Sequence, residues 1–171
     1  SCTQFDEQEA GAADEKADKV VFMAVTEAAV DTRTFLSGEM GEQYRQVLWQ
    51  PGDEIALFCE VWNDRKKFIN TEIEESSRAA FEGEISEGYS SYYGLYPYSE
   101  NIYQDGNNAN LYFSQRKEQS YRNNSFNSGS MPMACKAGNN QELYFYALGG
   151  VLAINLTGSE TVKSLSFTGY D

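Results

Sequence analysis

The chain has 171 residues, a length that suits one well-buried core and is short for two independent domains. It carries 26 acidic and 13 basic residues, a formal net charge of −13, so we expect neither nucleic acid nor an anionic lipid surface as a partner. It contains no histidine, which excludes His-based catalytic relays and His-ligated metal sites. The three cysteines are far apart and form no CxxC metal knuckle, so we expect no cofactor.

The first 18 residues, SCTQFDEQEAGAADEKAD, are acidic and small, and we interpret residues 1–18 as a flexible tether. Cys2, followed by such a segment, is similar to the cysteine that is exposed when a bacterial lipoprotein signal peptide is removed. Acylation of Cys2 would anchor the chain to a membrane and let the folded part stand off from it. A terminal cysteine that carries no lipid is the alternative.

Residues 19–171 are predicted to form a single domain of the all-β class. Short segments rich in β-branched and aromatic residues alternate with turn sequences such as Pro51-Gly52-Asp53, a spacing typical of a β-sandwich or barrel. The only window compatible with a helix, Thr26 to Asp31, is too short to stand alone. The predicted strands are residues 20–27, 46–50, 54–62, 66–73, 78–85, 92–98, 110–115, 132–137, 142–148, 150–157 and 162–169.

Alternation within these segments indicates which side chains face the core, because successive residues of a strand point to opposite faces. In residues 54–62 the predicted inward set is Ile55, Leu57, Cys59 and Val61. In the last predicted strand, Leu165 and Phe167 share a face and are placed inside.

The stretch YSSYYGLYPYSE, from Tyr89 to Glu100, contains five tyrosines within ten residues. Alternation places Tyr92, Tyr96 and Tyr98 on one face, and Gly94 leaves a gap between the rings that a sugar ring or a neighbouring strand could fill. A carbohydrate-binding surface would expose these three rings to solvent. Since both faces of the stretch are apolar, the pattern favours a strand buried within a sandwich.

Carboxylates are the groups on which any catalysis would have to depend. The pairs Glu74-Glu75 and Glu82/Glu84 raise the alternative of a glycosidase, which needs two carboxylates held across a bond. These acids lie among other charges at strand ends and turns, so we interpret them as solvated surface groups. The sequence therefore predicts no catalytic site and no metal site.

Cys59 and Cys135 both lie in predicted strands. A disulfide between them is one prediction, since an exported protein folds in an oxidising compartment. Two buried free thiols are the other, because nothing in the sequence fixes the separation of the two residues.

The order of several motifs resembles the N-terminal domain of the fimbrillin-like proteins of Bacteroidetes. The resemblance extends from about Val20 to Gly169. It implies a transthyretin-like Greek-key β-sandwich of roughly seven to eleven strands and an outer-membrane lipoprotein or cell-surface fimbria, with assembly into type V pili or related adhesins. The motifs are RTFL (33–36), VLWQPGDEIALF (47–58), AAFEGEI (79–85), YYGLYPYSE (92–100), MPMACKA (131–137), LGGVLAINLTG (148–158) and VKSLSFTG (162–169).

The resemblance also implies a mechanism of assembly. An Arg-specific protease would cut at Arg33 or Arg45, remove the first strand (Val20 to Glu27) and open a groove that a strand of the next subunit fills. The expected partners are therefore other pilus or surface subunits, together with host or bacterial surface glycans or proteins. The alternatives are an uncut surface lipoprotein or pilus anchor and a carbohydrate-binding surface module.

Overall fold

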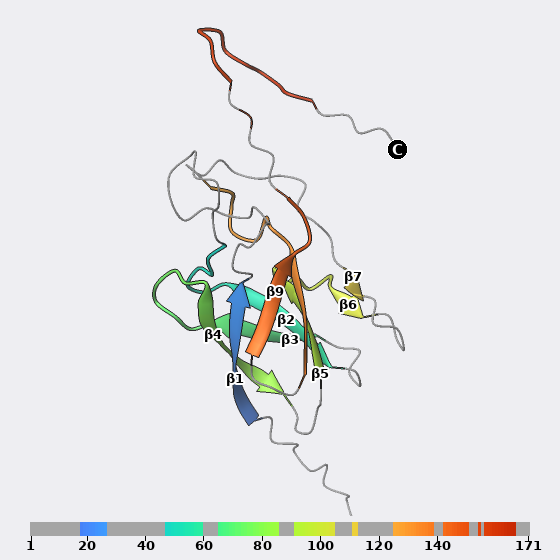
Figure 1. Cartoon of the computed structure of the whole chain (residues 1–171). Helices are drawn as coiled ribbons and strands as arrows, with labels where there is room; N and C mark the ends of the chain where they lie inside the picture. The colour runs from blue at the N-terminus through green and yellow to red at the C-terminus, as the bar shows by residue number, and fades with distance from the viewer. Residues whose placement is uncertain are drawn as a thin grey trace, which may run out of the picture.

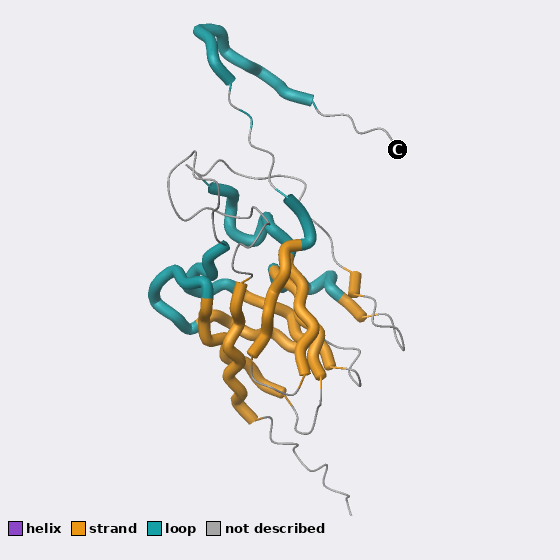
Figure 2. Tube along the Cα trace, viewed as in Figure 1, coloured by secondary structure: helices purple, strands orange, loops and turns teal. Residues whose placement is uncertain are grey.

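The computed structural model describes residues 18–26, 47–59, 65–85, 91–104, 111–112, 125–138, 142–150, 154 and 156–166. Within these ranges every regular element is a β-strand, which confirms the all-β class (Figure 2). The strands are β1 (Asp18–Thr26), β2 (Glu54–Cys59), β3 (Lys66–Asn70), β4 (Arg78–Ile85), β5 (Ser91–Tyr96), β6 (Tyr103–Gln104), β7 (Leu111–Tyr112), β8 (Met133–Gly138) and β9 (Glu142–Ala147).

Seven strands form one closed barrel in the order β1-β4-β3-β2-β5-β8-β9, and β6 pairs with β7 in a separate two-stranded sheet (Figure 1). The predicted sandwich of two sheets is therefore corrected to a barrel. The physical reason is that β1 bonds on both sides. It pairs antiparallel with β4, from Asp18 opposite Ile85 to Val25 opposite Arg78, and parallel with β9 over Met23–Thr26.

The barrel is filled by the inward face of each strand, with Trp49 at the centre. This residue makes only an isolated bridge to Ser76, so the strand predicted over residues 46–50 is absent from the described part, residues 47–50. The Trp49 indole is fully buried and meets three rings edge-on, with centroid distances of 5.0 Å to Phe81, 5.3 Å to Tyr96 and 5.3 Å to Phe145. Ile55 and Leu57 are buried in the same core, as alternation predicts.

A second, smaller apolar cluster lies on the outer face of β2 and β5. It comprises Ala56, Phe58, Leu95 and Ile102, with Tyr93 and Tyr98 packed against it. Residues 97–104 leave the end of β5 and place Ile102 over this face. Both faces of β2 and β5 are therefore buried, which explains why these two segments are apolar at nearly every position.

The strands predicted over residues 150–157 and 162–169 are wrong where the structure describes them. Ile154 and residues 156–166 form no strand and are exposed. Leu165, predicted to be inside, is 55% exposed, and Phe167 lies outside the described residues. The reason is topological: each strand of the described barrel already has a partner on both sides, so the barrel offers no edge to a further strand. Figure 1 shows this segment extending away from the barrel.

Candidate functional site

The surroundings of β1 form the first candidate site. We call this the β1 site and define it by Trp49, Phe68, Ala79, Tyr92 and Leu143, which contact or pair with the strand. The Phe22 ring is almost fully buried, with its centroid 5.4 Å from that of Phe68 and 4.9 Å from that of Tyr92. Ala24 lies opposite Ala79 on β4 and opposite Leu143 on β9. The strand thus supplies part of the core as well as the closing ladder.

The position of the last residues of β1 is fixed by hydrogen bonds to residues that belong to none of the barrel strands. The Thr26 hydroxyl donates to the carbonyl of Val47 at 2.8 Å, and its backbone N–H donates to Ser77 at 2.9 Å. The Trp49 indole N–H donates to the carbonyl of Ala24 at 3.1 Å. Buried polar groups are stable only when they are paired in this way, so β1 has a specific register in its site.

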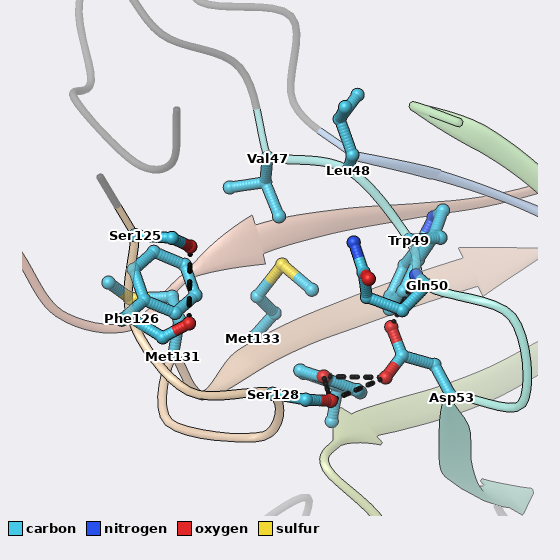
Figure 3. Close-up of a pocket in the computed structure, with 11 residues that line it drawn as sticks. Val47, Leu48, Trp49, Gln50, Asp53, Ser125, Phe126, Ser128, Met131 and Met133 are labelled. Carbon is cyan, nitrogen blue, oxygen red and sulfur yellow. Dashed lines mark hydrogen bonds between the residues drawn. The ribbon is translucent and has the colours of Figure 1, made fainter. Parts of the chain in front are cut away.

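A polar cluster around Asp53 includes Ser128 of the loop 125–130 (Figure 3). One carboxylate oxygen of this buried residue accepts from the Tyr96 hydroxyl at 2.9 Å and from Ser128 at 3.0 Å, and the other accepts from the Gln50 N–H at 2.8 Å. The Tyr96 oxygen accepts from the Gly129 N–H at 2.9 Å. Burial and the nearby Asp53 charge raise the pKa of the Tyr96 hydroxyl well above its usual range.

This arrangement suits a structural clamp better than an acid–base centre. Asp53 connects the turn after Trp49, the end of β5 and the loop 125–130. Its three donors replace the hydrogen bonds to water that the carboxylate loses on burial. Both carboxylate oxygens are engaged by donors of the same chain, which is typical of a buried structural carboxylate. The geometry therefore assigns the cluster to holding the loop against the barrel.

A small cavity opens beside this cluster, between the loop 125–130 and the chain around Trp49 (Figure 3). Its volume is about 30 Å³, enough for about two water molecules and too small for a sugar ring. The lining residues are Val47, Leu48, Trp49, Gln50, Asp53, Tyr96, Ser125, Phe126, Ser128, Met131 and Met133.

The predicted ligand face of Tyr92, Tyr96 and Tyr98 is not formed. Tyr92 and Tyr96 are only 6% and 7% exposed and belong to the main core. Tyr98, beyond the end of β5, is half-buried and packs against the outer cluster instead. Alternation correctly groups Tyr92 with Tyr96, but the barrel closes over the face that they share. An exposed tyrosine platform on β5 is therefore excluded.

The predicted gap between the rings at Gly94 is also filled by the core. A Cβ built on Gly94 would lie 2.6 Å from Cys135 Sγ and 2.9 Å from Phe145 Cζ. The space between the Tyr92 and Tyr96 rings is filled by the core of the same chain, so it admits neither a sugar ring nor another strand.

Of the two predictions for the cysteines, the Cys59–Cys135 disulfide is wrong, and the alternative of a buried free thiol is confirmed for Cys135. The register explains why: Cys59 on β2 pairs with Tyr92, and Cys135 on β8 pairs with Gly94, so β5 runs between them. Two strand spacings separate them by about 9–10 Å, whereas the Cα atoms of a disulfide lie within about 7 Å. Burial raises the pKa of the Cys135 thiol to about 12.

Exposed tyrosines do occur, on β9, at positions that were not singled out from the sequence. Tyr144 is 47% exposed and Tyr146 53% exposed, whereas Leu143 and Phe145 between them face the core. The Tyr144 hydroxyl donates to Glu142 at 2.8 Å, and the same carboxylate pairs with Arg78 at 2.8 Å. The alternation of ELYFYAL indicates that Tyr144 and Tyr146 share one face, opposite to that of Leu143 and Phe145. The higher density of tyrosines around β5 directed the prediction to that strand instead.

The remaining predicted sites are only partly within the structure. Cys2, Arg33 and Arg45 lie outside the described residues. Of the acidic pairs, Glu82 forms an ion pair with Lys19 on the barrel surface. Among the residues that are described, no group of three or more Cys, Asp or Glu side chains is placed to hold a metal ion. The same part of the chain contains no helix of the length and hydropathy needed to cross a bilayer.

Comparison with known proteins gives no match: no family model, no curated protein and no solved structure is significantly similar to this chain.

Proposed function

We propose that this protein is a non-catalytic cell-surface subunit, a fimbrial subunit or fimbrillin-like adhesin, that assembles by exchanging β1 for a strand of another subunit. The observation that carries the proposal is the position of β1. It is the first strand in sequence, and it lies between β4, with which it pairs antiparallel, and β9, with which it makes the one parallel pairing among the described strands. Residues 27–46, which separate it from the next described segment, contain both Arg33 and Arg45.

Removal of β1 would have two physical consequences that favour strand addition. The backbone edges of β4 and β9 would lose their partners, and unpaired edges are templates for an incoming strand. The core around Phe68 and Tyr92 would lose the Phe22 ring, and a replacement side chain would regain that buried area. Strands β2, β3 and β4 are consecutive in sequence and adjacent in the sheet, and β1 lies beside β4. This order has the form of a Greek key and supports the fimbrillin-like assignment.

Treatment of the full chain with an Arg-specific protease tests this function. We expect loss of the N-terminal fragment followed by oligomers, measured by native mass spectrometry and light scattering. The matched control is the Arg33→Lys/Arg45→Lys chain, which keeps the charge, resists cleavage in residues 27–46 and should remain monomeric. Strand exchange is wrong if the cut wild-type chain releases its fragment and stays a folded monomer by circular dichroism.

Display at the outer membrane through acylation of Cys2 belongs to the same proposal. Its test is metabolic labelling with a fatty-acid analogue of cells that express the precursor, with Cys2→Ser as the control. Label that persists in the Cys2→Ser chain would exclude Cys2 as the acylated residue.

Binding of surface glycans is a second candidate, favoured by the exposed rings of Tyr144 and Tyr146. Aromatic faces and neighbouring polar groups such as Glu142 are typical of sugar-binding surfaces. A glycan array with the wild-type chain and with Tyr144→Ala/Tyr146→Ala tests it. Equal binding by the two chains would remove these tyrosines from consideration.

A further inference from the structure

The three buried positions of β1, Phe22, Ala24 and Thr26, differ in size and in what surrounds them. Phe22 lies between two aromatic rings, those of Phe68 and Tyr92. Two residues later, Ala24 is fully buried and presents only a methyl group to the core. Thr26 then donates its hydroxyl proton to the Val47 carbonyl at 2.8 Å. A strand that replaces β1 would therefore have to fit the surroundings of all three positions.

The position of Ala24 is the most restrictive of them. Its neighbours across the ladders are Ala79 and Leu143, both fully buried. The Trp49 indole is held against this position by the hydrogen bond from its N–H to the Ala24 carbonyl. That indole cannot withdraw, because the rings of Phe81, Tyr96 and Phe145 contact it at 5.0–5.3 Å between centroids. Close-packed interiors accommodate added methylenes poorly, so a larger side chain here has no space.

Direction and charge at the β1 site are also defined. The strand runs antiparallel to β4 and parallel to β9. Near its start, Lys19 pairs with Glu82, and this hydrogen bond, with the nearby charges of Glu82 and Glu84, raises the pKa of the Lys19 ammonium. An incoming strand with a basic residue at that position keeps the favourable pairing.

We infer that the β1 site accepts an extended segment carrying an aromatic, a small and a hydroxyl residue at alternate positions, and that side-chain size at the position of Ala24 determines which strands it accepts. This inference rests on the strand exchange proposed above. Val21 provides an internal contrast, because its side chain points outward and is 45% exposed.

Peptide exchange into the cut chain tests the inference. The full chain is cleaved within residues 27–46 and incubated with a fluorescein-labelled peptide of the β1 sequence, DKVVFMAVT, and binding is followed by fluorescence anisotropy. We expect the wild-type, Ala24→Gly and Ala24→Ser peptides to bind with similar affinity. The Ala24→Leu peptide should bind at least about tenfold more weakly, in line with the effect of overpacking. The Val21→Leu peptide, which adds the same class of side chain to the outer face, should bind like wild type.

The outcomes separate the inference from the function on which it rests. Equal binding of the Ala24→Leu and wild-type peptides would overturn the size selection and leave strand exchange standing. Equal weakening by Val21→Leu and Ala24→Leu would also overturn it, because selection would then not depend on the inward position. Failure of every peptide, wild type included, would overturn strand exchange itself and the inference with it.

Discussion

Replacement of Gly94 by alanine should destabilise the barrel although it adds only one methyl group. The new Cβ would lie 2.6 Å from Cys135 Sγ, 2.9 Å from Phe145 Cζ and 3.0 Å from Leu57 Cδ2. All three neighbours are buried, so the strain of overpacking, about 1–3 kcal/mol, cannot be relieved toward solvent. Alanine restricts the unfolded chain more than glycine does, which offsets about 0.5–1 kcal/mol. We therefore expect the free energy of unfolding to fall by about 1 kcal/mol, and by no more than about 2.5 kcal/mol.

Urea unfolding followed by tryptophan fluorescence measures this change. The matched control is Gly149→Ala, where nothing lies within 4 Å of the added Cβ, so only the effect on the unfolded chain remains and we expect a gain of about 0.5–1 kcal/mol. A second variant identifies the contact responsible. Cys135→Ala removes the sulfur that would clash, so the Gly94→Ala/Cys135→Ala chain should be less destabilised than the sum of the two single changes.

Two results would refute this reasoning. A Gly94→Ala chain stabilised as much as the Gly149→Ala chain would show that the space beside Gly94 is open. A double variant whose destabilisation equals the sum of the single changes would show that Cys135 is not the neighbour that opposes the methyl group.

Three further predictions concern other parts of the barrel. Phe22→Ala should lower the free energy of unfolding by about 3–5 kcal/mol, and Val21→Ala on the exposed face by no more than about 0.5 kcal/mol, both measured in urea. Tyr96→Phe removes a donor from the buried Asp53 carboxylate and should cost about 1–3 kcal/mol, whereas Tyr146→Phe on the surface should be neutral. Stability should fall as the pH rises above about 9–10, where the Cys135 thiol and the Tyr96 hydroxyl ionise in the unfolded chain while their raised folded-state pKa values keep them protonated in the barrel. Urea midpoints between pH 7 and 11 check this, and Cys135→Ala should reduce the fall.

The side-chain pattern within individual strands could be predicted from the sequence. Alternation correctly groups Ile55 with Leu57 and Tyr92 with Tyr96, and the structure places both pairs in the main core. The turn at Pro51-Gly52-Asp53 is confirmed as well: Gly52 has a φ of 77°, and the Asp53 N–H donates to the Gln50 carbonyl at 3.0 Å. Each of these features depends on residues within a few positions of one another, which is the range over which a sequence pattern is informative.

Two features of the candidate site depend on contacts between distant parts of the chain and could not be predicted from the local sequence. Whether Tyr92 and Tyr96 are exposed depends on Phe22 and Trp49, which come from distant parts of the chain. Whether Cys59 can reach Cys135 depends on β5 lying between their strands. Neither fact has a local signature, so the sequence left an exposed tyrosine face open beside a buried strand, and a disulfide open beside free thiols.

The sequence by itself determined that this chain is all-β, which side chains of its main strands share a face, and that no histidine chemistry is available to it. Only the tertiary structure decided that the sheet closes into a barrel, that β1 lies between β4 and β9, and that the residues around Leu165 remain outside it. The physical reason is that the two-residue period of a strand is set locally. The choice of neighbour for β1, by contrast, is made by hydrogen bonds and core contacts to β4 and β9, far along the chain.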